Sequence, residues 1–392
     1  MQAIIHTIWI LFQLLIGYNL VLPVILYIAW LFSNRKKPIS KNNLQTDHAV
    51  IVTAYEQIDL LPAVVESLLK IEHKRFTIYI VADKCDISSL HFDDPRVVLL
   101  RPPETLASNT RSHFYAIRHF TRDHTHLTII DSDNIADPNY LREIDLYLQA
   151  GFDAVQGQRK AKNLNTTYAC LDAARDIYYH FYDGLVLYNI GSSATLAGSG
   201  MTFSVKLYRD SLEHLDIQGA GFDKVLQAEI LKRGYRIAYA PDAIVYDEKT
   251  SKPEQLVKQR ARWINTWFRY FKFGFVLLAK GLTGFSRNQT VFGIVLLRPP
   301  LFIFLVLSVI CMLANVFINP MIAIYWLISL VVFVLGFIIA LTVSHTDPRI
   351  YRSLKNIPQF IFYQVLSLLK VRKANKHSVA TKHYHDNSTT TL

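Results

Sequence analysis

The 392-residue chain is poor in cysteine, and its three cysteines are far apart in the sequence: Cys85, Cys170 and Cys311. No Cys-x-x-Cys pair occurs, so the sequence indicates neither a disulfide framework nor a cysteine-based metal site. This composition is compatible with a reducing compartment. The chain also lacks a Lys/Arg-rich recognition motif, which argues against nucleic acid as a partner although the formal net charge is +11. An anionic ligand or an anionic membrane surface is the preferred explanation of that charge.

Three long segments contain no acidic residue, lysine or arginine: Ile4–Phe32, Leu301–Ile318 and Met321–Val343. A membrane-spanning helix needs about 20 mostly apolar residues, so these lengths favour spans over buried core helices. The first segment lacks a basic amino-terminal region and a small-residue cleavage site, which predicts a retained anchor rather than a cleaved signal peptide. The Asn-Pro pair between the other two segments predicts a tight turn and therefore a hairpin.

Basic residues next to the first and third spans predict the orientation of the chain. Asn34–Lys37 reads NRKK and Lys370–His377 reads KVRKANKH. Because basic flanks stay on the cytoplasmic side, we expect a multi-pass protein of the cell membrane with a cytoplasmic polar middle. The predicted segments are a membrane anchor at 1–36, a cytoplasmic domain at 41–285, a transmembrane hairpin at 290–345, an interfacial amphipathic helix at 350–375 and a disordered tail at 376–392.

The polar middle alternates between apolar, β-branched runs and segments with helical spacing. The predicted strands are His48–Glu56, Arg75–Cys85, Arg96–Pro103 and His126–Asp133, and the predicted helices are Asp59–Lys70, Ser108–Phe120 and Pro138–Gln149. This alternation predicts an α/β domain with a mostly parallel, Rossmann-like sheet. In such sheets ligands bind beyond the carboxyl ends of the strands.

Acidic residues follow several of these strands. The stretch LTIIDSDN places Asp131 and Asp133 two residues apart, so both carboxylates can face one site. Mg²⁺ takes one or two carboxylates and completes its coordination with phosphates and water, which predicts a metal–diphosphate ligand. An ordinary Asp-rich turn is the alternative. Glu56 and Asp83 also end strands, which predicts several carboxylates along one edge of the sheet.

Two later segments add further candidate site residues. Asp223 begins an amphipathic helix, where a structural carboxylate favoured by the helix dipole is the alternative explanation. If Pro253–Phe271 is helical, Gln259, Arg262 and Trp263 share a face. Arginine suits phosphate oxygens, and an aromatic ring can cover the apolar face of a sugar. The same segment also has the composition of an amphipathic helix at a membrane surface, and the two interpretations are compatible.

The ordered set TAYE, VADKCD, DSD, GFDK and QRARW resembles the membrane-bound family 2 glycosyltransferases, a group that includes cellulose, hyaluronan and chitin synthases and bacterial N-acetylglucosamine polymerases. The resemblance covers about Val50–Trp267 and the placement of the membrane segments. It implies a GT-A fold, a nucleotide-sugar donor (usually a UDP-sugar), Mg²⁺ or Mn²⁺ as cofactor, and inversion at the anomeric carbon.

The resemblance also implies roles for individual residues. It assigns the nucleotide sugar to Thr53, Tyr55, Glu56, Asp83 and Asp131. It assigns the metal to Asp133, the catalytic base to Asp223, and the diphosphate and acceptor to Gln259, Arg260, Arg262 and Trp263. Phe222 stands where family members commonly have a glutamate before the base.

We therefore expect a hexosyltransferase that acts on a saccharide or lipid-linked acceptor at the bilayer, by processive or single transfer. A hydroxyl acceptor is a poor nucleophile near neutral pH, so a positioned carboxylate must take its proton. The alternative is a non-catalytic binding or transport subunit, which intramembrane ionisable residues would support; the spans have essentially none. A nucleotide-sugar hydrolase or nucleotidyltransferase on a related fold is a third possibility.

Overall fold

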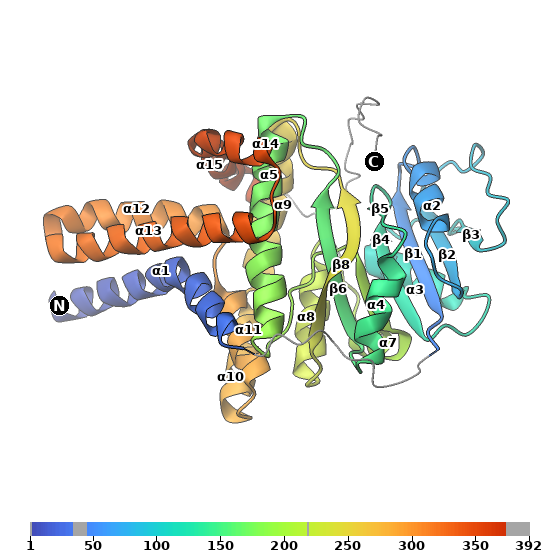
Figure 1. Cartoon of the computed structure of the whole chain (residues 1–392), viewed down its shortest axis with the longest axis horizontal. Coiled ribbons are helices and arrows are strands. Elements are labelled where there is room, and N and C mark those ends of the chain that lie inside the picture. Colours follow the sequence, from blue (N-terminus) through green and yellow to red (C-terminus); the bar gives the residue numbers. More distant parts are fainter. Residues whose placement is uncertain (1, 34–44, 218, 374–392) are drawn as a thin grey trace.

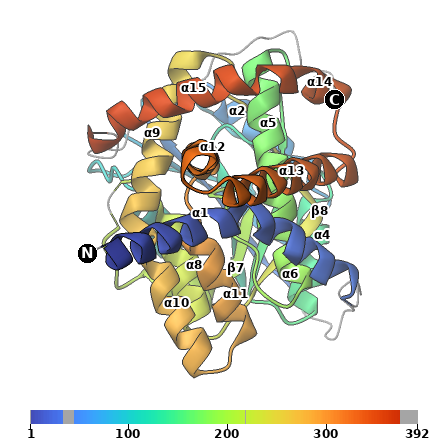
Figure 2. The same ribbon diagram turned by 90° about the vertical axis from the view of Figure 1, so that its left-hand side faces the viewer.

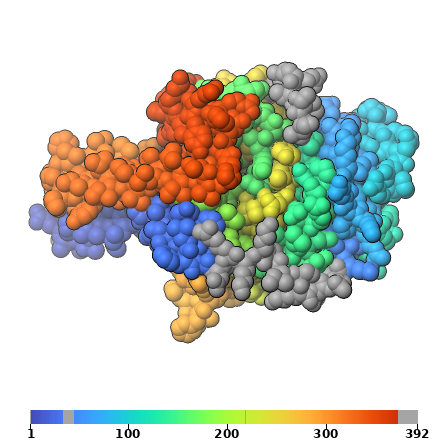
Figure 3. Space-filling model, viewed as in Figure 1, coloured from blue at the N-terminus to red at the C-terminus, as the bar shows by residue number. Residues whose placement is uncertain are grey.

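The computed structural model describes residues 2–33, 45–217 and 219–373. The basic flank Asn34–Lys37 and the predicted tail 376–392 lie outside the described residues. An α/β domain forms one side of the molecule, and three long helices project from its other side (Figure 1). The space-filling view shows these helices as a rod that stands clear of the domain (Figure 3).

The domain is built on an eight-stranded sheet in the order β3-β2-β1-β4-β7-β6-β8-β5. The strands are β1 (His48–Tyr55), β2 (Phe76–Asp83), β3 (Val97–Leu100), β4 (His126–Asp131), β5 (Ile135–Ala136), β6 (Ala154–Ala161), β7 (Met201–Ser204) and β8 (Ile237–Asp247). Four of the seven strand pairings are parallel. The predicted α/β class is confirmed, and the sheet is mixed because β7 runs antiparallel to both β4 and β6.

Successive residues of the central strands are buried on opposite faces of the sheet. In β1, Ala49 and Ile51 belong to one apolar core, whereas Val50 and Val52 belong to the other. The first core is covered by α3 (Asn109–Arg118), α7 (Val205–Leu212) and α8 (Phe222–Lys232), and the second by α2 (Leu61–Leu69) and α4 (Tyr140–Gln149). Burial on both faces explains why these strands are continuous apolar runs.

The predicted strands and helices of the domain occur within a few residues of their expected bounds. The run LTIIDSDN ends β4 at Asp131, and Asp133 follows in the turn. Parallel pairing of β1 with β2 and β4 places Tyr55, Asp83 and Asp131 near one edge of the sheet. The predicted alignment of acidic strand ends is therefore present.

Three of the described helices are long and apolar enough to cross a membrane. They are α1 (Gln2–Leu31), α12 (Leu301–Ile318) and α13 (Pro320–Val343). The Asn-Pro pair joins α12 to α13, and the Asn319 side chain caps α13 by accepting a hydrogen bond from the Ile322 N–H. Less than a third of each span is buried within the protein, so most of its apolar surface requires a nonpolar surrounding.

Side chains fill the space between the three spans. Gln13 Oε1 accepts hydrogen bonds from Asn315 Nδ2 at 2.6 Å and from Trp326 Nε1 at 2.8 Å, one partner from each of the other two helices. Closer to the domain, Phe304 of α12 and Phe333 of α13 pack edge to face. The spans thus hold together through apolar packing and one buried polar cluster.

Further helices surround the base of the spans. They are α9 (Pro253–Tyr270), α10 (Lys272–Thr283), α11 (Arg287–Leu297), α14 (Pro348–Ser353), η2 (Leu354–Asn356), α15 (Ile357–Ser367) and η3 (Leu368–Lys373). Viewed along the spans, α15 lies above α12 and α10 below it (Figure 2). Large apolar side chains are exposed on this ring of helices, among them Phe268, Phe275, Phe362 and Leu369. This pattern is typical of helices at a membrane surface.

The helices α5 (Thr167–Tyr179), η1 (His180–Val186) and α6 (Leu187–Asn189) connect the domain to the spans. The η1 segment is a π-helix. Tyr178 packs against Phe333 and Phe337 of α13, and the Tyr182 hydroxyl donates a hydrogen bond to the Gly336 carbonyl at 2.7 Å. The sheet and the membrane helices are therefore joined by direct side-chain contacts.

A buried histidine in α3 predicts acid sensitivity. His113 shares a 2.7 Å hydrogen bond with the Tyr208 hydroxyl and packs against Phe222, and burial lowers its pKa to about 3. Unfolded histidine binds a proton below pH ~6.5, so folded-state stability falls by about 1.4 kcal/mol per pH unit between there and about pH 3. The substitution His113→Gln removes this pH-dependent part of the folding stability.

We therefore expect the His113→Gln variant to lose about 2 kcal/mol less stability than the parent protein between pH 7 and pH 5. The measurement is thermal denaturation of the detergent-solubilised protein at both pH values. His119→Gln is the matched control, because His119 is exposed at the end of the same helix. Equal pH dependence in the parent and the His113→Gln variant would contradict the assignment.

Candidate active site

One cavity of about 1540 Å³ opens beyond the carboxyl ends of β1, β2 and β4. Its lining continues along α9 and reaches Leu301 and Phe302 in the first turn of α12. Pockets for a single small ligand usually measure roughly 300–1,000 Å³, so this cavity has room for more than one ligand.

Ten of the eleven predicted site residues line this cavity: Thr53, Tyr55, Asp83, Asp131, Asp133, Asp223, Gln259, Arg260, Arg262 and Trp263. The eleventh, Glu56, does not line it. Its carboxylate forms an ion pair with Lys84 Nζ at 2.6 Å, and its backbone has a positive φ of 59°. The fold therefore brings together residues that lie up to 210 positions apart in the sequence.

A group of aspartates forms the acidic part of the cavity. Burial, followed by the charge of Asp133, raises the pKa of Asp131 to about 7, and the carboxylates of Asp247 and Asp223 contribute to the same shift. Crowded carboxylates of this kind repel one another unless a proton or a cation is present. Carboxylate oxygens are the ligands that Mg²⁺ and Mn²⁺ prefer, so a divalent cation bound by these aspartates would relieve the repulsion.

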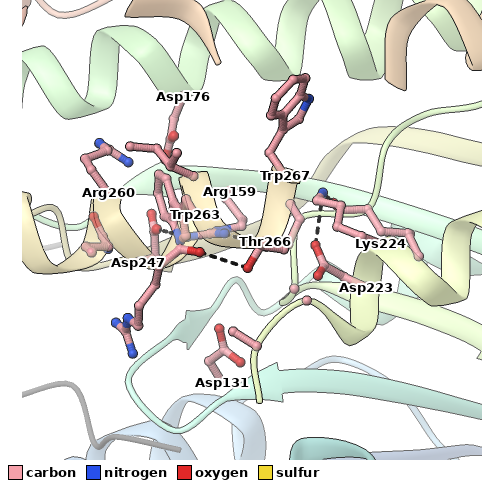
Figure 4. Close-up of a pocket in the computed structure, with 18 of the residues that line it drawn as sticks. Asp131, Arg159, Asp176, Asp223, Lys224, Asp247, Arg260, Trp263, Thr266 and Trp267 are labelled. Carbon is pink, nitrogen blue, oxygen red and sulfur yellow. Dashed lines mark hydrogen bonds and ion pairs between the residues drawn. The ribbon is translucent and has the colours of Figure 1, made fainter. Parts of the chain in front are cut away.

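Next to the aspartates, seven buried or half-buried side chains form a continuous chain of alternating charge. The order is Arg260, Asp172, Arg175, Asp176, Lys249, Asp247 and Arg159, and each member forms an ion pair with the next. We call this set the ion-pair chain. It connects α9, α5, the end of β8 and β6, and Figure 4 labels four of its members beside Asp131.

The ion-pair chain carries more positive than negative charge. Four cations and three carboxylates give 4 − 3 = +1 when all are ionised. Burial raises the pKa of Asp172, but Arg260 and Arg175 outweigh this effect and the net shift is downward. Asp172 is therefore held as a carboxylate. An excess of positive charge on one wall of a cavity favours an anionic group at that wall, such as a diphosphate.

Sequence reasoning missed the carboxylates of the ion-pair chain. Asp172 and Asp176 are four residues apart on α5 and so face the same way, which is a detectable but weak signal. Asp247 ends β8 in the same way that Asp83 ends β2 and Asp131 ends β4, and this repetition could have identified it.

The predicted helix at Pro253–Phe271 is present as α9, and its four predicted residues face the cavity. The Trp263 ring contacts two guanidinium groups, with Arg260 Cζ 4.1 Å and Arg175 Cζ 4.2 Å from its centroid. Gln259 Oε1 accepts a hydrogen bond of 3.0 Å from the Thr250 hydroxyl. Burial lowers the pKa of Arg262. The cation–π contacts fix the orientation of Trp263 at the cavity wall.

Asp223 lies in the first turn of α8, where the helix dipole favours a negative side chain. Lys224 Nζ lies 3.0 Å from Asp223 Oδ2 and also donates to the Leu196 carbonyl at 2.8 Å. The residue before this helix, Gly221, has φ of 100°. A Cβ atom there would lie 2.5 Å from Thr266 Cγ2, so the start of α8 is in close contact with α9.

A second group of possible metal ligands occurs at the opposite end of the sheet. His48, His73 and Asp145 have ligand atoms close enough to hold a metal ion. Both imidazole Nε2 atoms lie within hydrogen-bond distance of Asp145, at 2.9 and 3.1 Å. His73 Nδ1 accepts a hydrogen bond from the Arg75 N–H, so Nε2 carries the proton in the neutral ring. His48 begins β1, roughly 23 Å along the strand from Tyr55 at its other end.

Comparison with known proteins identifies the family. A model described as "Glycosyltransferase like family 2" matches residues 46–266, which is 221 of the 392 residues, and the chain belongs to this family. A search of curated proteins finds no match. Among solved structures, the mannosyltransferase PcManGT from Pyrobaculum calidifontis in complex with GDP-Man and Mn²⁺ is similar with a TM-score of 0.57. The match covers 90% of this chain and 95% of that one at 14% sequence identity.

These findings confirm the predicted glycosyltransferase family and the GT-A-like fold. At 14% identity the structural similarity concerns the fold alone. The resemblance to the cellulose and chitin synthase branch of the family stays a prediction.

The contact at Gly221 predicts a specific loss of function. Gly221→Ala forces Thr266 or the start of α8 to move, which displaces Asp223, and a displacement of about 1 Å can lower a rate about 100-fold. Gly234→Ala is the control, because Gly234 also has a positive φ (83°) but has open space around its Cβ position. The left-handed conformation costs each alanine about 1–2 kcal/mol.

The measurement is the rate of nucleotide release from a donor sugar, beside the denaturation temperature of both variants. We expect similar losses of stability and a much lower rate only for Gly221→Ala. Equal rates in the two variants would show that this contact does not position Asp223.

Proposed function

We propose that this glycosyltransferase moves a hexose or N-acetylhexosamine from a nucleotide sugar to a hydroxyl group of an acceptor at the membrane, with inversion. The observation that carries the proposal is the convergence of three groups in one cavity: the aspartates at the strand ends, the positively charged ion-pair chain, and Asp223. Family membership supports the transfer of a sugar.

In this proposal the nucleotide binds at the carboxyl ends of β1 and β2, beside Thr53, Tyr55 and Asp83. Asp83 is held in place because its carboxylate accepts hydrogen bonds from the N–H groups of Leu106 (2.9 Å) and Ala107 (2.7 Å). We propose uridine as the nucleoside, from the resemblance in the sequence. The similar mannosyltransferase is complexed with GDP-Man, so guanosine is the alternative that an experiment must separate.

The diphosphate would bind between the aspartates and the ion-pair chain. Asp133, with Asp131 and Asp247, would hold Mg²⁺ or Mn²⁺, which supplies positive charge to the leaving diphosphate. Arg262 and Gln259 line the adjacent wall, and Arg260 and Arg175 add positive charge behind Trp263. Fixed cations in a buried site stabilise developing negative charge without reorganisation during the reaction.

Asp223 is the proposed general base. It takes the proton of the acceptor hydroxyl while the acceptor oxygen forms a bond to the anomeric carbon. The bond between that carbon and the diphosphate oxygen breaks, and the bonding electrons leave with the nucleoside diphosphate. One displacement of this kind inverts the anomeric configuration. Trp263, exposed by about a third at the cavity wall, would border the sugar with the exposed part of its ring.

We place this reaction on the cytoplasmic side of a cell membrane. The support is the basic sequence after the first and third spans, since such flanks remain in the cytoplasm. The exposed apolar side chains of α9, α10 and α15 would then lie at the inner surface of the bilayer.

The test is nucleoside-diphosphate release from a panel of UDP- and GDP-sugars by protein purified in detergent, with Mg²⁺ or Mn²⁺ and after chelation. We expect release with one donor class and its loss on chelation. Asp223→Asn should lower kcat by about 100- to 10,000-fold, because base catalysis contributes this much, while donor affinity stays unchanged. Asp133→Ala should weaken metal-dependent donor binding instead.

Asp93→Asn is the control for these variants, because Asp93 is highly exposed and lies outside the cavity. Full activity in Asp223→Asn would remove this residue from the role of base and leave the transferase intact. Absence of release from every donor, with lipid and saccharide acceptors supplied, would overturn the proposed function in favour of a binding or transport protein.

A further inference from the structure

The cavity extends well past the proposed donor site, towards the base of the membrane helices. Apolar residues line this end of the cavity. Trp267 belongs to α9 and Phe271 follows it, Pro299 and Pro300 precede α12, Leu301 and Phe302 begin α12, and Leu369 belongs to η3. Leu301 and Phe302 are the first residues of the second membrane span. A single cavity therefore runs from Asp223 to the position where a span enters the bilayer.

The membrane end of the cavity also carries polar groups suited to a lipid headgroup. Lys258 and Lys370 line the cavity, and both side chains are exposed. The indole N–H of Trp267 is buried and has no hydrogen-bond partner among the described residues. Basic side chains at this level attract anionic lipid surfaces, and an unpaired buried donor favours a ligand oxygen.

The opening lies between elements that are in contact with one another. Helix α9 packs against α15 and η3, and α15 also packs against α12. Asn265 of α9 donates a hydrogen bond to the Val371 carbonyl at 3.0 Å, which ties η3 to α9 beside the opening. Leu369, 82% exposed, therefore contributes both to the cavity and to the outer apolar surface.

Side-chain contacts occupy the space between the three spans. Gln13 accepts hydrogen bonds from Asn315 and Trp326 near the turn of the hairpin, and Phe304 packs on Phe333 closer to the domain. A single set of three spans filled in this way leaves the cavity at the base of α12 as the route between Asp223 and the bilayer.

We propose that the acceptor is a bilayer lipid with a free hydroxyl in its headgroup, and that each lipid receives one sugar. Its acyl chains stay beside α12 and η3, its headgroup passes Trp267 and the basic residues, and its hydroxyl reaches Asp223. This inference rests on the proposed function, since it names the acceptor of that same site. The hydroxyl proton goes to Asp223, the hydroxyl oxygen binds the anomeric carbon, and the nucleoside diphosphate leaves.

The experiment follows a radiolabelled donor sugar in membranes that contain the full chain. Phosphatidylcholine vesicles carrying dioleoylglycerol, phosphatidylglycerol or ceramide are fused with these membranes, and water-soluble oligosaccharides are added in parallel. Products are separated into organic-soluble lipid, water-soluble oligosaccharide, precipitable polymer and free sugar. Nucleoside diphosphate is measured in the same samples.

We expect label in organic-soluble lipid, with one sugar for each lipid molecule. Label in polymer, in soluble oligosaccharide or in free sugar, together with nucleotide release, would overturn the lipid acceptor and leave sugar-donor chemistry in place. Absence of nucleotide release would remove the proposed function along with this inference. The two failures are thus distinguishable.

A matched pair of variants tests the route itself. Leu369→Glu places a carboxylate at the opening, and we expect transfer to vesicle lipid to fall at least about tenfold, the effect of roughly 1.4 kcal/mol. Transfer to short-chain, water-soluble dihexanoylglycerol should change less than twofold, because this acceptor need not leave a bilayer. Leu146→Glu is the control, because Leu146 is an exposed residue of α4 and lies outside the cavity. Equal losses with both acceptors would place the route elsewhere.

Discussion

The ion-pair chain is the constraint on which the site depends. Seven buried or half-buried charges from separate elements satisfy one another, and removing one partner of a buried pair commonly costs about 3–5 kcal/mol because a charge is left uncompensated. The charged residues come from different elements: Arg260 belongs to α9, Asp172 and Asp176 belong to α5, and Asp247 ends β8. The relative positions of these elements are therefore tightly determined, and with them the position of Trp263 against Arg175.

The same arrangement joins the chemistry to the membrane. One side of α5 faces the cavity with its aspartates, while Tyr178 at its end packs on α13. Arg298, just before the second span, forms a buried ion pair with Asp183 of η1. A helix that is anchored in both places cannot move relative to the spans without disturbing the cavity. This coupling fits the proposal that the acceptor arrives from the bilayer.

Much of the architecture could be predicted because it depends on local sequence. Apolar runs of about 20 residues specify spans wherever they occur, and burial on both faces makes the central strands continuous apolar segments. The two aspartates at the end of β4 and the polar face of α9 are also local patterns. The sequence therefore predicted Asp131, Asp133 and Trp263 as residues of the cavity that the structure contains. The antiparallel direction of β7 was not predicted, because a four-residue strand carries little information about its partners. The α10–α11 pair was missed for a similar reason: its close packing depends on Gly281 meeting Thr290.

The sequence by itself determined the α/β class, the three spans and most residues of the candidate site. Each of these features depends on residues that are neighbours along a strand or helix. Only the tertiary structure decided which charges are paired. Asp172 and Asp247 became site residues because they meet Arg260 and Arg159 from distant parts of the chain. Conversely, Glu56 follows β1 as expected but pairs with Lys84 outside the cavity. The depth of the cavity, from the strand ends to the first turn of α12, likewise depends on contacts between remote segments that no local pattern encodes.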